Sequence, residues 1–104
     1  MHLRIVPSAN YQTWHAEQET EFMINRRKWG VPTEPIKKCS MNIIITFPDR
    51  IKADLTNKAE SIMDLLVDLG VLEDDSHFNC DDLRLISGGV DKKTAGAIVD
   101  IFYK

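Results

Sequence analysis

No apolar run in this 104-residue sequence is long enough to cross a membrane. Apolar runs such as residues 43–45 and 62–63 are far shorter than the ~18 residues that a transmembrane helix requires. The N-terminus also lacks the basic region followed by an apolar stretch that marks a secretion signal. The sequence therefore predicts an unprocessed cytoplasmic protein with no membrane partner.

Cysteine, glycine and proline are all scarce, with two, five and four residues respectively. Cys39 and Cys80 do not form a CxxC motif, and two cysteines without a secretion signal usually remain reduced. This pattern predicts free thiols and argues against a disulfide framework or a zinc site. With 43% hydrophobic and 28% charged residues, the composition is that of an ordinary globular protein. A chain of this length is expected to form one domain, residues 1–104.

An excess of basic charge is missing as well, because the formal net charge is −3. The negative charge is concentrated between residues 49 and 82, which contain ten acidic and three basic residues. The rest of the chain is mildly basic, with ten basic and six acidic residues. An acidic segment in an otherwise basic chain indicates a metal-binding site in a protein that approaches an anion.

Strand and helix signals follow one another along the chain. We expect strands at residues 3–6, 41–47, 83–86 and 97–103, helices at residues 19–28 and 55–69, and a turn at Gly88 and Gly89. The order is β, helical connection, β, α, β, β. It predicts an α+β fold in a single small domain, with a mixed β-sheet packed by helices.

The helix at residues 55–69 has the clearest signal in the sequence. Its apolar residues recur at the spacing of one buried stripe: Leu55, Ala59, Ile62, Leu66 and Leu69. The opposite face is polar: Asn57, Ser61, Asp64 and Asp68. Thr56 and Glu60 are expected at the boundary between the two faces, where a functional side chain can be held in place. Gly70 is expected to end the helix.

Acidic residues stand at both ends of this helical unit. They supply the hard oxygen ligands that Mg²⁺ prefers: Asp54, Glu60, Asp74 and Asp75. Mg²⁺ held by carboxylates can activate water and relieve charge on a phosphodiester, which is what phosphodiester hydrolysis requires. Other roles remain open, because Asp54 also suits a helix N-cap and Glu60 can pair with Lys52 or Lys58. The acidic turn can also be an ordinary solvated turn.

Ten of the thirteen basic residues are scattered in small groups rather than gathered in one motif: Arg26, Arg27, Lys28, Lys37, Lys38, Arg50, Lys52, Lys58, Lys92 and Lys93. They permit phosphate contacts, although no signature of a known nucleic-acid-binding module accompanies them. Tyr11, Trp14 and Trp29 can stack on unpaired bases, but aromatic residues near a sheet more often belong to the core. Both interpretations of these aromatic residues remain open.

Three segments carry a resemblance to a known family. They are Pro7-Ser8-Ala9-Asn10, then Phe47-Pro48-Asp49-Arg50, and then Asp54-Leu55-x-Asn57 with Asp64, Leu65, Gly70 and Asp74-Asp75. In this order and spacing they resemble the RusA family of Holliday-junction resolvases, small endonucleases common in phages and prophages. The resemblance covers residues 3–10 and 41–82 well, and the C-terminal strand pair loosely.

This resemblance implies an α+β homodimer that binds four-way DNA junctions. Its chemistry would be two symmetric nicks, made with Mg²⁺, for which Mn²⁺ can substitute. The family's catalytic carboxylates correspond to Asp54 and Asp75, with Asp74 adjacent to them. DNA contacts are expected at the following residues: Asn10, Arg50, Lys52, Asn57 and Lys58.

The chain departs from the family at two positions of the acidic helix. Thr56 stands where the family commonly has a second aspartate, and Glu60 stands where it has a lysine. Thr56 and Glu60 are i, i+4 neighbours on a helix, so we expect Glu60 to supply the missing carboxylate as a catalytic and metal-binding residue, and Lys58 the missing cation. The alternatives are a junction-binding protein without catalysis and a small acidic interaction domain with no DNA role.

Overall fold

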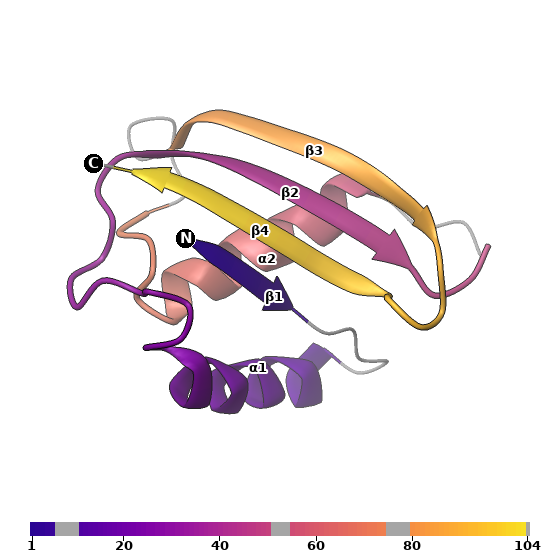
Figure 1. The fold of residues 1–104 in the computed structure, drawn as a ribbon, viewed down its shortest axis with the longest axis horizontal. Coiled ribbons are helices and arrows are strands. Elements are labelled where there is room, and N and C mark those ends of the chain that lie inside the picture. Colours follow the sequence, from indigo (N-terminus) through magenta and orange to yellow (C-terminus); the bar gives the residue numbers. More distant parts are fainter. Residues whose placement is uncertain (6–10, 51–54, 75–79, 104) are drawn as a thin grey trace.

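Two helices and four strands make up the part of the chain that the structure, a computed structural model, describes: residues 1–5, 11–50, 55–74 and 80–103 (Figure 1). In chain order they are β1 (His2–Ile5), α1 (Tyr11–Asn25), β2 (Cys39–Phe47), α2 (Leu55–Asp68), β3 (Cys80–Val90) and β4 (Gly96–Tyr103). Neither of these helices is long and apolar enough to span a membrane.

The four strands form one mixed sheet in the order β1-β4-β2-β3. β4 pairs antiparallel with both β1 and β2, whereas β2 and β3 are parallel. A parallel pair needs a long crossover connection, and α2 provides it. At the centre of the sheet, Ile43 pairs with Val99 on β4 and with Leu85 on β3. The α+β fold with a mixed sheet packed by helices, predicted from the sequence, is confirmed.

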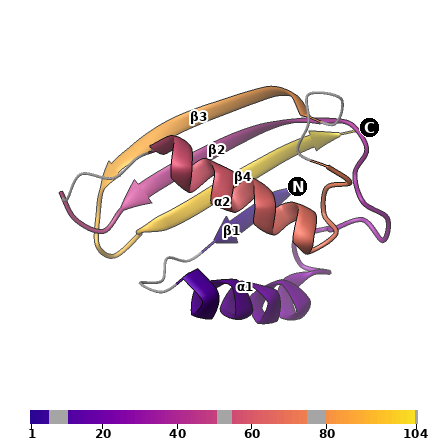
Figure 2. The same ribbon diagram turned by 180° about the vertical axis from the view of Figure 1, so that it is seen from behind.

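The hydrophobic core lies on one face of the sheet. Figure 2 shows α2 across that face and α1 beside the β1 edge. Burial alternates along β2: Cys39, Met41, Ile43 and Ile45 are buried, while Ser40, Asn42, Ile44 and Thr46 are partly exposed. This period of two is what a strand shows when a single face is covered. The other face of the sheet therefore carries no helix among the described residues.

α2 forms where the sequence predicted it and ends for the predicted reason. Its buried side chains form one stripe toward the sheet: Ala59, Ile62, Met63, Leu65 and Leu66. Gly70 has a φ of 75°, a left-handed conformation that glycine adopts without steric cost. The Gly70 N–H donates to the Val67 carbonyl at 3.0 Å and the Val71 N–H to the Leu66 carbonyl at 2.9 Å. These are the two hydrogen bonds of a Schellman motif, which satisfies the last carbonyls of the helix.

The first helix differs from its predicted position. It was expected at residues 19–28, but α1 runs from Tyr11 to Asn25. Its buried face carries Trp14, Gln18 and Phe22 at i, i+4 and i+8. Because the middle residue of this stripe is polar, although only 3% exposed, the apolar periodicity that marks a helix is interrupted.

The predicted turn at Gly88 and Gly89 is also wrong. Both glycines lie within β3, which pairs with β2 as far as Val90 opposite Phe47. The turn lies after β3, at residues 92–94. Asp91, just before it, still donates its N–H to the Phe47 carbonyl at 2.9 Å. The physical reason is a close approach between strands: a Cβ on Gly88 would overlap Thr46 Oγ1 on β2.

Gly88→Ala is expected to destabilise the protein by about 1–3 kcal/mol, because the added methyl group overpacks the contact with Thr46. Chemical denaturation of both proteins measures this difference. In a Thr46→Ala background the hydroxyl oxygen is gone, so the cost of Gly88→Ala should fall to well under half. An equal cost in both backgrounds would show that the cost arises from the other β2 atoms near this Cβ, Ile44 Cγ2 at 3.3 Å and the Ile45 carbonyl oxygen at 3.4 Å, and not from Thr46.

Candidate metal and DNA-binding site

The candidate site residues are distributed over α2 and its two flanking segments. Glu60 lies in the second turn of α2, and Asp74 follows the helix after the buried residues Val71 and Leu72. The candidate DNA contacts Asn57 and Lys58 are exposed in the first turn, and Arg50 is exposed after β2. The remaining predicted residues lie outside the described part of the chain: Asn10, Lys52, Asp54 and Asp75.

Glu60 and Thr56 are both exposed, one helical turn apart on α2. The expectation that they sit at the boundary of the buried face is therefore wrong, since α2 turns both side chains to solvent. Pairing of Glu60 with a lysine was the alternative role. Among the described residues Glu60 makes no ion pair with Lys58, and Lys52 lies outside them. An exposed carboxylate is accessible to a hydrated Mg²⁺ ion, which keeps several of its waters when it binds protein.

α2 keeps Glu60 away from Asp74 within one chain. At ~1.5 Å of rise per residue, about 12 Å of helix axis separates Glu60 from Asp68 at the end of α2. The chain then continues beyond the helix, where Ile36 forms an isolated parallel bridge with Leu72. Figure 2 shows this segment leaving the end of α2 that is remote from Glu60. A single ion cannot be held by Glu60 and Asp74 of the same chain.

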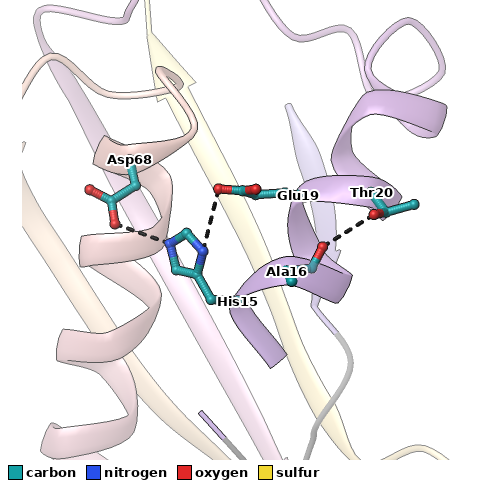
Figure 3. A network of polar contacts seen from close by, with 5 residues as sticks. All are labelled: His15, Ala16, Glu19, Thr20 and Asp68. Atoms are coloured by element: carbon teal, nitrogen blue, oxygen red, sulfur yellow. Dashed lines mark hydrogen bonds and ion pairs between the residues drawn. The ribbon is translucent and has the colours of Figure 1, made fainter. Parts of the chain in front are cut away.

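Asp68 has a structural role at the interface between the two helices (Figure 3). Its carboxylate Oδ2 lies 3.1 Å from His15 Nε2 of α1. The other ring nitrogen, His15 Nδ1, lies 3.4 Å from Glu19 Oε1 on the same helix. The imidazole ring thus stands between a carboxylate of α1 and a carboxylate of α2. This network connects the two helices. It also engages Asp68, one of the acidic residues of segment 49–82, in a contact with His15.

Two further acids, at the beginning of β3, have basic neighbours. Lys38 Nζ lies 3.9 Å from Asp81 Oδ2, and Arg84 lies 3.7 Å from Asp82 Oδ2. All four side chains are more than half exposed, so each pair contributes little to stability. Their main effect is to reduce the local negative charge at this end of the acidic segment.

Trp14 of α1 and Trp29 of the following loop pack with the hydrophobic core, and the Tyr11 side chain lies outside the described residues. Trp14 is only 8% exposed. Trp29 packs against the core, with its ring centroid 6.5 Å from that of Phe22. Arg26 is engaged as well, because its guanidinium lies over the Phe22 ring and donates a hydrogen bond to the Pro32 carbonyl. The stacking interpretation is therefore wrong for Trp14.

Cys39 and Cys80 form a pair that no sequence motif indicated. They are free thiols and register partners on the parallel strands β2 and β3. A cavity of about 800 Å³ lies beside Cys39, with a lining that also includes Lys37, Lys38, Asp81, Phe102 and Tyr103. The two cysteines are close because β2 and β3 are neighbours in the sheet. The sequence pattern does not reveal which strands are neighbours.

Among the described residues, no three His, Cys, Asp or Glu side chains converge on a point that could hold a metal ion. The candidate ligands Glu60 and Asp74 retain the right chemistry, since exposed carboxylates are hard oxygen donors suited to Mg²⁺. No protein-family model and no curated protein matches this chain.

Proposed function

We propose that the protein is a Mg²⁺-dependent, structure-selective endodeoxyribonuclease of RusA type, which resolves four-way DNA junctions in recombination and repair. The observation that carries this proposal is the position of the acidic motif on the fold. Residues 55–68 of the motif form α2, which starts directly after Asp54 in the sequence and is followed by the Gly70 cap ahead of Asp74. The proposed site of action is the cytoplasm.

The carboxylates Asp54, Glu60, Asp74 and Asp75 are the proposed ligands of Mg²⁺, with Asp54, Asp75 and Glu60 as catalytic residues. When bound, the metal ion supplies an activated water and stabilises charge on the phosphate. The proposed role of the basic residues Arg50, Lys52 and Lys58 is to hold the DNA backbone, and that of the polar residues Asn10 and Asn57 is to position it.

The distance between the two ends of α2 supports a homodimer. Since Glu60 and Asp74 of one chain cannot share an ion, a two-fold dimer offers a way to complete a site, with the acidic turn of one subunit beside α2 of its partner. A four-way junction has approximate two-fold symmetry of its own. Two equivalent sites related by the dimer axis would then make paired, symmetric nicks.

The test is incubation of the purified protein with a labelled synthetic four-way junction and with a matching linear duplex. Each substrate is incubated with Mg²⁺, with Mn²⁺ and with EDTA. Paired nicks in the junction are expected with either metal, with no cleavage in EDTA and none of the linear duplex. Because the net charge is −3, junction binding should be weak without metal and should fall steeply as salt rises. Equal cleavage of both substrates would contradict structure selectivity.

A second candidate function is junction binding without catalysis. Thr56 favours it, because this exposed position in the first turn of α2 carries no carboxylate, although the family commonly has an aspartate there. A junction that is shifted on a native gel but intact with every metal would identify this function. Lack of any junction affinity at low salt would instead indicate an acidic interaction domain with no DNA role.

A further inference from the structure

Cys39 and Cys80 are placed opposite each other at the beginning of β2 and β3. Neighbouring strands lie ~4.7–4.9 Å apart, and a disulfide accommodates Cα atoms separated by roughly 4.4–6.8 Å. A register irregularity between Cys39 and Ser40 sets Asp82 rather than Asp81 opposite Ser40. The irregularity begins after the Cys39–Cys80 pair, so ordinary strand spacing applies to the pair itself and falls within the range that a disulfide accommodates.

The two side chains also lie on the same face of the sheet. Cys39 is 4% exposed and belongs to the hydrophobic core, and Cys80 is partly buried against that core. Cys80 Sγ lies 3.8 Å from the Asp82 carbonyl oxygen. Register partners on one face of a sheet project their side chains side by side, which is the second requirement of a disulfide.

The two thiols differ in how they are reached: a cavity at the beginning of β2 is lined by Cys39 but not by Cys80, which is itself partly exposed. The cavity has a volume of about 800 Å³, and Cys39, Lys38 and Asp81 contribute to its lining. Cys80 is the more exposed of the two cysteines. An oxidant would therefore react first at Cys80, with Cys39 behind it as the second thiol.

We propose that Cys39 and Cys80 form a reversible disulfide site that joins β2 to β3, with a low-molecular-weight disulfide such as oxidised glutathione as the oxidant. The Cys80 thiolate attacks one glutathione sulfur, forms a mixed disulfide and releases one glutathione thiolate. The Cys39 thiolate then attacks the Cys80 sulfur and releases the second glutathione. The protein loses two protons and two electrons in total, and one oxidised glutathione becomes two reduced molecules.

Burial sets the rate of this exchange. It raises the pKa of Cys39 to about 12 and also raises the pKa of Cys80, so both thiols are protonated at neutral pH. Because the thiolate is the attacking species, the rate of disulfide formation should increase as the pH rises toward these pKa values. At constant oxidant concentration we expect close to a tenfold increase per pH unit from pH ~7 to ~8.

The disulfide would close a loop that contains most of the acidic segment. Residues 40–79 lie between the two cysteines and include α2 and Asp74. A cross-link around a loop of this length restricts the unfolded chain and is expected to raise the thermal midpoint by on the order of 10 °C. This inference is independent of the proposed nuclease function, because it depends only on the strand pairing and on the thiols.

The test is incubation of the native full chain with oxidised glutathione, followed by intact-mass spectrometry and thermal denaturation. The expected product is a monomeric chain lighter by two hydrogen atoms, with a raised thermal midpoint that dithiothreitol returns to its original value. In Cys39→Ser the reaction should stop at a stable glutathione adduct on Cys80, and Cys39→Ala provides the same control if serine is not tolerated in the core. Two free thiols after incubation, a persistent adduct on the wild type, or a disulfide between chains would each overturn the proposal.

Discussion

Glu60→Gln should reduce metal-dependent nicking of a four-way junction by on the order of 100-fold, the scale of losing one charged group that stabilises a transition state. Glutamine keeps the shape of the side chain and removes the negative charge that the proposed metal site requires. Glu60 is exposed on α2, so the change should alter the free energy of unfolding by less than about 0.5 kcal/mol. Initial rates of junction cleavage over a range of Mg²⁺ concentrations, together with a denaturation curve, measure both effects.

The matched control for Glu60→Gln is Asp64→Asn. Asp64 lies one turn further along α2, is also exposed and carries the same charge, but it is not among the proposed ligands. Asp75→Asn, which removes a proposed catalytic residue, gives the reference for a fully inactive protein. Full activity in Glu60→Gln would disprove the proposal that Glu60 replaces the carboxylate missing at Thr56. Equal losses in Glu60→Gln and Asp64→Asn would show that the effect comes from the overall negative charge of α2 and not from a metal ligand.

The elements that could be predicted from the sequence are those whose burial pattern is uninterrupted. α2 was predicted correctly because its stripe contains only apolar residues and because Gly70 permits the left-handed conformation that ends it. α1 was misplaced because Gln18 lies in the middle of its buried face. β3 was predicted too short because Gly88 has the composition of a turn, whereas its role is to allow close approach to Thr46.

The geometry of the candidate site depends on tertiary structure and could be predicted only in part. The sequence identifies the chemistry of Glu60 and Asp74, because carboxylates near a helix are visible as residue types. The distance between them follows from the length of α2 and from the path of the chain after Gly70, which a local pattern does not contain. The proximity of Cys39 and Cys80 likewise could not be predicted from a local pattern, because the parallel register of β2 and β3 is a property of the assembled sheet.

Ile43→Ala should destabilise the protein by about 2–5 kcal/mol, the range for removing a large aliphatic side chain from a packed core. Ile43 is 0% exposed and lies at the centre of the sheet, between Val99 on β4 and Leu85 on β3. For a domain of this size the thermal midpoint should fall by at least about 8 °C. Thermal and urea denaturation of the wild type and the variant measure the effect.

Ile44→Ala is the matched control, because it makes the same substitution at the next position of the same strand. Both variants lose the same β-branched side chain and the same strand propensity. They differ only in the face of the sheet, since Ile44 is partly exposed opposite Ile98, on the face that neither α1 nor α2 covers. Ile44→Ala should therefore cost less than half as much as Ile43→Ala. Equal costs would mean that both faces of the sheet are buried in solution, which requires a second layer of protein over the face that carries Ile44.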